Sequence, residues 1–495
     1  MTPPKSTPAP TDTPTAPGPA GSETPVLGVI VGNRDFFPDA LVSEARRDIE
    51  SVFKDMEIEP VWVTEEETKL GGVESHADAR RCAERFAQNR DRILGIVVVL
   101  PNFGDEKGVM DAVSLADLNV PILVQACPDD PEQLDPGKRR DAFCGKISVC
   151  NNLVQRGIPF SLTRAHTLDL KSPVFRRELA QFLGVCRVVR GLRGLRIGAV
   201  GARPVAFNTV RYSEKLLQRA GIGVQTVDLS EILAAAEQVA PDSEAVGATI
   251  EAFRGYAPVA GVPADKLVQM ARLDIALRQW MREANVQATA IQCWTSLQSN
   301  WGCNICTSMS MMSEGFVPSA CEVDVTGVLT MYAMQLAAGS PSALVDWNNN
   351  YGDDPEKCVL FHCGNWAKSF QPDGRVANAP ILGTTLGVEN TYGAMEGRTP
   401  ASPLTYARLT TDDCRGVIRA YVGEGTLTDD PLKTFGNRAV AQVPELPALL
   451  RYVCRNGFEH HVAMTMSHSA AALEEAFATY FGWDVYCHHR YDSET

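Results

Sequence analysis

In the first third of the chain, apolar runs alternate with stretches in which apolar residues recur at helical spacing. Residues 26–31, 93–100 and 120–126 are nearly continuous runs of Val, Ile and Leu, and each has the length of a buried strand. Residues 39–56 have the spacing of an amphipathic helix. Strands that are apolar on both sides and separated by helices indicate a parallel sheet covered on both faces. The pattern predicts a doubly wound α/β domain over residues 25–188.

The alternation starts afresh beyond residue 190. A strand at 196–200 is followed by a helix at 213–221, and further strands are predicted at 224–230 and 288–294. This second cycle predicts another doubly wound α/β domain, which we place at residues 189–340.

From residue 341 to residue 495 the chain has short strands, many Gly and Pro residues and few long helices. Segments 358–365, 405–410 and 416–425 are typical of an antiparallel sheet or barrel. The predicted fold class is therefore α/β, with two doubly wound α/β domains followed by a C-terminal β-rich, barrel-like domain.

The composition is that of a soluble globular protein, since 45% of the residues are hydrophobic and 21% are charged. The net charge of −14 argues against nucleic acid or an anionic membrane as a partner, because both attract basic surfaces. Residues 1–24 are rich in Pro, Thr and Ala, which predicts a disordered tail and no secretory signal. No stretch reaches the roughly 18 apolar residues of a membrane helix, and we expect a cytoplasmic protein.

The 14 cysteines are scattered and lie mostly in apolar surroundings, which fits reduced, buried thiols better than a disulfide framework. Cys303 and Cys306 have the spacing of a zinc knuckle or a redox pair. The chain has no second such pair, so the structural interpretation is favoured. The Gly-containing segments 28–34 and 198–204 match neither a dinucleotide nor a phosphate loop. A ligand is expected instead at the carboxyl ends of the strands.

Two carboxylates precede a long apolar stretch. Ser319 and Glu322 fit a capping box, in which Glu322 would only accept a hydrogen bond from a free backbone N–H. Asp324 is interpreted as a solvated residue of the first helical turn, where the helix dipole favours negative charge. The spacing alone favours the cap over a functional carboxylate at Glu322, without excluding the latter.

Other polar residues lie in or beside apolar strands. Asp346 is either a turn residue or a site carboxylate. His362 lies inside an apolar strand, where a single His is more often a core residue than a ligand. His460 and His461 stand side by side in a chain with only eight histidines. Each of these positions, taken alone, leaves both a structural and a functional interpretation open.

The same positions taken together suggest a metal site. Two carboxylates and two neutral imidazoles suit a divalent cation such as Mn²⁺, Co²⁺ or Fe²⁺. Zn²⁺ prefers thiolates or a fixed tetrahedral set, and Ca²⁺ prefers oxygen only. A carboxylate-rich site with open positions can chelate two adjacent sugar oxygens while a carboxylate moves a proton between C1 and C2. Aldose–ketose isomerisation requires that combination.

The order of several motifs resembles that of the L-fucose isomerase-like proteins, within the larger L-fucose/L-arabinose isomerase group. The motifs include LPNFGDE (100–106), RRDAFCGKISVCNNL (139–153), SACEVDVTG (319–327), LVDWNNN (344–350), LFHCGN (360–365) and HHVAM (460–464). The resemblance runs from about residue 27 to the C-terminus. It implies two α/β domains and a β-rich domain, an enediol mechanism, and a divalent metal, usually Mn²⁺, with Co²⁺ or Mg²⁺ as alternatives. It also implies a homo-oligomer, hexamer or trimer, whose active sites are completed by neighbouring subunits.

The resemblance assigns roles at the metal. It implies that Glu322 and Asp346 are metal ligands and catalytic carboxylates and that His461 is a metal ligand. His362 matches a metal ligand of the arabinose isomerase branch better than one of the fucose branch.

The resemblance also points to residues that bind substrate. Gln292 and Trp294 fall where the family lines its sugar pocket, and Arg34 and Asn102 are predicted to reach a neighbouring subunit's site. His460 stands where the fucose enzymes are similar to Asn and the arabinose enzymes to His. Since successive strand residues point to opposite sides, His460 is predicted to contact the sugar or orient a ligand rather than bind the metal.

The leading hypothesis is a metal-dependent aldose–ketose isomerase of an unphosphorylated monosaccharide of the L-fucose, D-arabinose or L-arabinose type. A non-catalytic sugar-binding protein on the same fold is an alternative, and a metal-dependent lyase or epimerase is a third. The presence of both carboxylates favours an enzyme over a binding protein.

Overall fold

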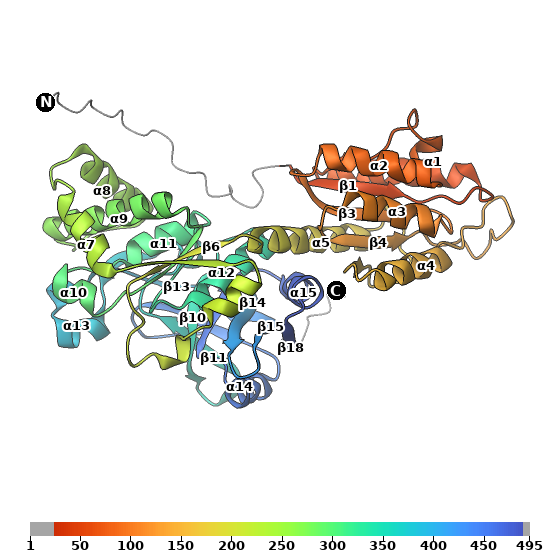
Figure 1. Ribbon diagram of the computed structural model, residues 1–495. Helices are drawn as coiled ribbons and strands as arrows, with labels where there is room; N and C mark the ends of the chain where they lie inside the picture. Colours follow the sequence, from red (N-terminus) through yellow and green to blue (C-terminus); the bar gives the residue numbers. More distant parts are fainter. Residues whose placement is uncertain (1–23, 489–495) are drawn as a thin grey trace, which may run out of the picture.

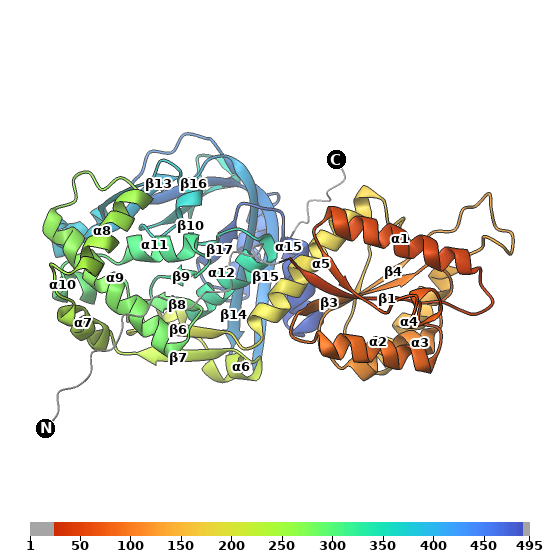
Figure 2. The same cartoon turned by 90° about the horizontal axis from the view of Figure 1, so that it is seen from above.

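In the computed structural model, the described residues, 24–488, form two lobes joined by one long helix, α5 (Pro173–Leu192) (Figures 1 and 2). The predicted tail lies outside the described residues except for its last position. The predicted boundary near residue 188 falls within α5. No helix in the described part of the chain is long and apolar enough to cross a membrane.

The smaller lobe is built on a five-stranded parallel sheet in the order β2-β1-β3-β4-β5. Helices α1 and α5 cover one face, and α2, α3 and α4 cover the other, so both faces are buried as the apolar strands require (Figure 2). The elements are β1 (Val26–Val31), α1 (Asp39–Asp55), β2 (Glu59–Val61), η1 (Lys69–Gly71), α2 (His76–Gln88), β3 (Ile93–Leu100), α3 (Glu106–Ala116), β4 (Ile122–Ala126), α4 (Ala142–Gln155) and β5 (Ser161–Leu162).

The larger lobe begins with a four-stranded parallel sheet in the order β7-β6-β8-β9. The strand predicted at 224–230 ends at Val227, because Asp228 accepts a hydrogen bond from the Ser230 N–H and begins a helix. The elements are β6 (Arg196–Val200), η2 (Asn208–Val210), α6 (Glu214–Arg219), β7 (Gly223–Val227), α7 (Leu229–Gln238), α8 (Glu244–Tyr256), α9 (Ala264–Ala284), β8 (Ala288–Ile291), α10 (Ser296–Asn300), α11 (Cys306–Glu314), β9 (Ser319–Ala320) and α12 (Val325–Ala338).

The remaining strands form a mixed nine-stranded sheet in the order β12-β13-β16-β11-β10-β17-β14-β15-β18. Because β15 also pairs with β16, six of them close into an antiparallel ring, which confirms the predicted barrel-like domain. The elements are β10 (Ala343–Tyr351), β11 (Asp354–His362), η3 (Lys368–Phe370), β12 (Arg375–Asn378), α13 (Pro380–Leu386), η4 (Val388–Asn390), β13 (Tyr392–Arg398), β14 (Ser402–Asp412), β15 (Val417–Thr428), β16 (Asn437–Gln442), α14 (Leu446–Arg455), β17 (His461–Thr465), α15 (Ala470–Glu475), η5 (Ala476–Tyr480) and β18 (Asp484–His488).

Helix α12 connects the parallel sheet to the ring. Almost all of its residues are buried, and it packs against β8 on one side and against β14 and β17 on the other. One hydrophobic core includes Ile197 of the parallel sheet, Leu329 of the helix and Ala407 of the ring. This packing fixes the loop that precedes α12 beside the ring strands, and that loop carries Glu322.

Candidate active site and metal centre

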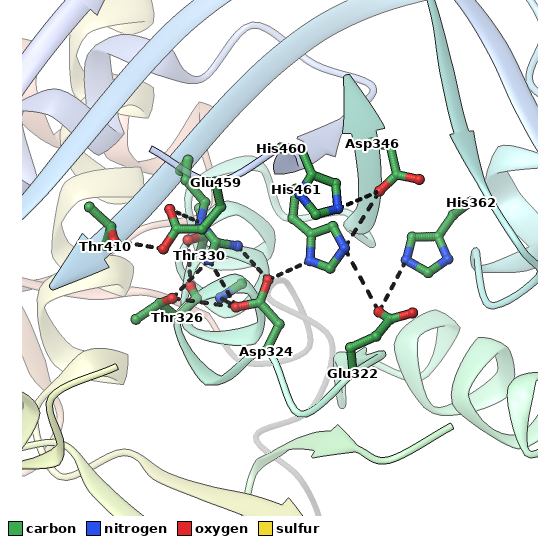
Figure 3. Close-up of polar contacts among 12 residues, drawn as sticks. Glu322, Asp324, Thr326, Thr330, Asp346, His362, Thr410, Glu459, His460 and His461 are labelled. Carbon is green, nitrogen blue, oxygen red and sulfur yellow. Dashed lines mark hydrogen bonds and ion pairs between the residues drawn. The ribbon is translucent and has the colours of Figure 1, made fainter. Parts of the chain in front are cut away.

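Three adjacent ring strands and the loop before α12 bring four predicted residues together (Figure 3). Asp346 of the central strand β10 lies opposite His461 of β17 in the strand register. His362 is the last residue of β11, on the other side of β10. Glu322 enters from the loop between β9 and α12. The structure therefore assembles the proposed metal set from segments far apart in sequence.

The side chains face one another across a short gap. His461 Nε2 lies 3.5 Å from Asp346 Oδ1 and 3.8 Å from Glu322 Oε2, and His362 Nε2 lies 3.8 Å from the same Glu322 oxygen. Glu322, His362 and His461 are buried, whereas the Asp346 side chain is 23% exposed. All four line a cavity of about 260 Å³, so the cluster is open to a ligand on the Asp346 side.

The backbone at Glu322 is held in an unusual conformation. Glu322 and Val323 both have φ of 56°, in the left-handed region that a β-branched residue rarely adopts. Such residues cost about 1–3 kcal/mol each and cluster at functional sites. The capping-box interpretation is wrong, because Ser319 lies in β9 and Asp324 caps α12 through the Gly327 N–H. Glu322 is thereby free to point into the cavity.

A buried ion-pair network holds His461. Its Nδ1 donates to Asp324 at 2.8 Å (Figure 3), and Arg408 binds both oxygens of Asp324 at 2.6 and 2.9 Å. Arg408 also donates to Glu459 at 3.1 Å. Fixing Nδ1 as the donor directs Nε2 of His461 toward the cavity, where it can bind a metal ion once it has lost its proton.

The network shifts the pKa values of Asp324 and His461. Burial alone would raise the pKa of Asp324, but the charge of Arg408 and the hydrogen bonds from His461 and Arg408 hold it far below its usual range. Burial would lower the pKa of His461, but the hydrogen bond to Asp324 and the nearby carboxylates raise it overall. The interpretation of Asp324 as a solvated residue is wrong, since its side chain is completely buried. The sequence analysis missed Arg408, although a charged residue between the apolar residues of a strand could have indicated this network.

Glu322 and His362 have unpaired polar atoms that face the same space. Glu322 Oε1 accepts a hydrogen bond from Trp294 Nε1 at 2.8 Å, but its Oε2 and the Nε2 of His362 have no hydrogen-bond partner among the described residues. Buried polar atoms are normally paired, so these two point to a ligand between them. Burial raises the pKa of Glu322, an effect that His362 and His461 only partly offset. Glu322, His362 and His461 thus form one set of side chains that could hold a metal ion, and Asp346 lies beside it, 3.5 Å from His461.

His362 differs from His461 in its bonding. Its Nδ1 accepts the backbone N–H of Cys363 at 2.9 Å, so in the neutral ring the proton sits on Nε2 and faces Glu322. In this state His362 is a hydrogen-bond donor to the cavity. It can bind a metal ion through Nε2 only after that proton leaves.

His460 lies closer to the cluster than strand alternation predicts. The strand β17 begins at His461, so His460 precedes the regular alternation, and its ring centroid lies 4.4 Å from that of His461. Its Nε2 is 3.9 Å from Asp346 Oδ1, and its side chain is 44% exposed. Burial and the charge of His461 lower its pKa. His460 lines the cavity at an exposed position, and it forms a further possible ligand set with Asp346 and His461.

The remaining predicted residues lie at different distances from the cluster. Trp294 lines the cavity, whereas Gln292 faces a separate cavity of about 810 Å³ and accepts the Ala202 N–H at 2.9 Å. Arg34 and Asn102 lie in the smaller lobe, where Arg34 donates to Gly104 and Asn102 to Asn33. A single chain does not bring these two residues to the cluster.

An apolar wall faces the metal cluster, and the sequence analysis did not single it out. Phe207 packs edge-on against Trp294 and His460, at centroid distances of 5.3 and 5.6 Å. Phe361, Phe435 and Ile381 complete this side of the cavity. Phe207 and Phe435 lie in loops, where hydrophobic periodicity does not predict which side chains are buried.

The chain matches two family models. Residues 28–193 match "Fucose/sulfoquinovose isomerase, N-terminal domain", and residues 360–489 match "L-fucose isomerase, C-terminal domain". The second match includes His362 and His461. The chain belongs to the fucose/sulfoquinovose isomerase family.

Curated relatives agree with this assignment at low identity. A sulfoquinovose isomerase of Priestia aryabhattai is 25% identical over 253 residues, which cover 50% of this chain and 54% of the relative. Those of Clostridium sp. (strain MSTE9) and Alkalicoccus urumqiensis are 26% and 24% identical, over 57% and 61% of this chain and 63% and 66% of the relatives. The chain thus spans about half to two thirds of the length of these relatives.

Proposed function

We propose that the protein is a metal-dependent aldose–ketose isomerase of an unphosphorylated monosaccharide. The observation that carries this proposal is the convergence of two carboxylates and two histidines on one cavity, with Glu322 Oε2 and His362 Nε2 facing each other at 3.8 Å and lacking hydrogen-bond partners among the described residues. Membership of the fucose/sulfoquinovose isomerase family supports the class of reaction.

Glu322, Asp346 and His461 would hold the metal ion. Their two carboxylates and one imidazole favour Mn²⁺, with Co²⁺ or Mg²⁺ as alternatives. The ion supplies positive charge that polarises the sugar carbonyl and stabilises negative charge on the adjacent oxygens.

The protein groups carry the proton. Conversion of an aldose to a ketose removes the proton from C2 and delivers one to C1, while a hydroxyl proton passes from O2 to O1. Glu322 suits this exchange because burial raises its pKa above the ordinary value of a Glu and the Trp294 N–H fixes its orientation. Asp346 is the second carboxylate beside His461, at 3.5 Å from its Nε2, and the apolar wall around Phe207 excludes water from the reacting atoms.

The cavity favours a neutral sugar. None of the described residues that line it is Lys or Arg, so the negatively charged sulfonate of sulfoquinovose would have no cationic partner within one chain. The apolar wall of Phe207, Phe435 and Ile381 suits the methyl group of a 6-deoxy sugar such as L-fucose.

A sugar panel tests this preference and the proposed reaction together. Metal-stripped and Mn²⁺-reconstituted enzyme is incubated with L-fucose, D-arabinose, L-arabinose and sulfoquinovose, and ketose formation is measured. We expect turnover only with metal, and a higher kcat/KM for L-fucose than for sulfoquinovose, because the cavity lining of one chain offers the sulfonate no Lys or Arg. Faster turnover of sulfoquinovose would contradict the neutral-sugar assignment, and no turnover with tight sugar binding would favour a binding protein.

We further propose that a neighbouring subunit closes the site with its smaller lobe, in a trimer or hexamer. The exposed apolar side chains Phe143, Ile147 and Val154 follow one face of α4 in that lobe, as an interface helix would present them. We expect Arg34→Gln to raise KM by about tenfold with a smaller change in kcat, because Arg34 would contact the sugar of another subunit. Sedimentation velocity measures the oligomer, and a monomer with full activity would contradict this arrangement.

A further inference from the structure

Four cysteines meet beside the metal cluster, and the proposed reaction uses none of them. Cys293 follows β8, Cys306 begins α11, Cys321 follows β9 and Cys363 follows β11. All four are free thiols. Cys293, Cys306 and Cys321 are buried, while Cys363 is partly exposed and lines the same cavity as Glu322. The group is therefore reachable from the cavity through Cys363.

The thiols gather around Cys321. Its sulfur lies within 4.8 Å of that of Cys363 and within 4.8 Å of that of Cys293. The ligand atoms of Cys321, Cys363 and His362 all lie within 4.8 Å of one another, as do those of Cys293, Cys321 and Glu322. Cys303, the expected partner of Cys306 in the sequence, takes no part in these sets.

The chemistry of this group differs from that of the neighbouring carboxylates. Thiolates are soft ligands that select ions such as Zn²⁺ and its heavier relative Cd²⁺, whereas carboxylates select Mn²⁺ or Mg²⁺. In a tetrahedral zinc site, bonds of about 2.3 Å to sulfur and about 2.1 Å to nitrogen place the two ligand atoms about 3.6 Å apart. Cys363 Sγ lies 3.6 Å from His362 Nδ1. The spacing of this pair is already that of two ligands on one ion.

We propose that Cys321, Cys363 and His362 Nδ1 form a binding site for a thiophilic divalent cation of the Zn²⁺ or Cd²⁺ class, next to the carboxylate site. Cys293, whose sulfur lies within 4.8 Å of that of Cys321, is in place to supply the fourth ligand. The ion replaces the Cys363 N–H as the partner of His362 Nδ1. The site thus offers a soft ligand set on one side of His362 and a hard set on the other.

Because the thiols select soft ions, we expect that Mn²⁺ does not displace a thiophilic ion from this second site. An ion bound by the thiols also binds Nδ1 of His362. It therefore fixes the orientation of the imidazole ring, whose Nε2 faces Glu322.

The test is a Cd²⁺ titration of the reduced, full-length protein in excess Mn²⁺, followed by the near-ultraviolet charge-transfer absorption of cadmium thiolates. This readout does not depend on turnover, so it is independent of the proposed reaction. We expect the band to saturate at one equivalent per chain. Cys321→Ser and Cys363→Ser should each weaken Cd²⁺ binding at least about tenfold, because even indirect changes at metal sites cost about 10–100-fold.

Cys414→Ser is the matched control, since Cys414 is exposed in the turn between β14 and β15 and should leave the band unchanged. If the fully buried Cys321→Ser variant does not fold, Cys363→Ser, at a partly exposed position, decides the result. The proposal would be overturned if the wild type showed no band, if the band persisted undiminished in Cys363→Ser, or if it were lost in Cys414→Ser.

Discussion

Glu322→Gln should reduce Mn²⁺-dependent sugar turnover by at least about a hundredfold, the scale of a lost acid–base group. Gln keeps the size of the side chain and can still accept the Trp294 N–H, so the loop is expected to remain in place. The amide cannot carry the proton between C1 and C2, and it offers a metal ion no negatively charged oxygen. Turnover is measured at saturating sugar and at several Mn²⁺ concentrations, which separates lost affinity for the ion from lost chemistry.

Asp346→Asn is the paired variant and should show a loss of similar size, because it removes the other carboxylate beside His461. Glu251→Gln is the control, since Glu251 is an exposed carboxylate on α8 and far from the cavity in the fold. Near-wild-type turnover in either Glu322→Gln or Asp346→Asn would show that the site is wrongly assigned.

Arg408→Met should lower the free energy of unfolding by about 3–5 kcal/mol, because it leaves two buried carboxylates without their partner. Arg408 is completely buried and pairs with both Asp324 and Glu459. Urea unfolding followed by tryptophan fluorescence measures the change. Arg375→Met is the matched control, since the Arg375–Glu396 pair is exposed and should contribute less than about 1 kcal/mol.

The pH dependence of the same variant identifies the cause. Since the pKa of Asp324 in the folded protein lies far below its unfolded value of about 3.9, the pair stabilises the fold above that pH and ceases to do so as the pH falls. The difference between wild type and Arg408→Met should therefore shrink below about pH 4. A difference that stays constant down to pH 2 would indicate lost packing instead of lost charge pairing.

The sequence predicted the fold because hydrophobic periodicity reports which faces are buried. The apolar runs at β1, β3 and β6 appear as strands with the expected bounds, and the antiparallel segments after residue 340 close into the ring. Periodicity does not report which strands become neighbours. The pairing of β10 with both β11 and β17, which brings the site together, was not predicted, and the family resemblance supplied only the residues of the site.

Two details of the site escaped prediction for physical reasons. The capping-box spacing of Ser319 and Glu322 is a local rule, and it failed because the left-handed residues Glu322 and Val323 delay the start of α12 to Val325. Strand alternation predicted that the side chains of His460 and His461 point to opposite sides, but it does not apply to a residue that precedes the strand. Both failures lie at the loop ends that carry the candidate ligands, where local strain and tertiary contacts outweigh sequence periodicity.

The most direct test of the central claim follows the proton. Metal-stripped enzyme and Mn²⁺-reconstituted enzyme are each incubated with L-fucose in D₂O, and the sugar is examined by NMR. We predict that only the reconstituted enzyme forms the ketose, with solvent deuterium at C1 and no cleavage of the carbon chain. Sugar binding without deuterium incorporation in the presence of Mn²⁺, or cleavage of the chain, would contradict the assignment of this site to aldose–ketose isomerisation.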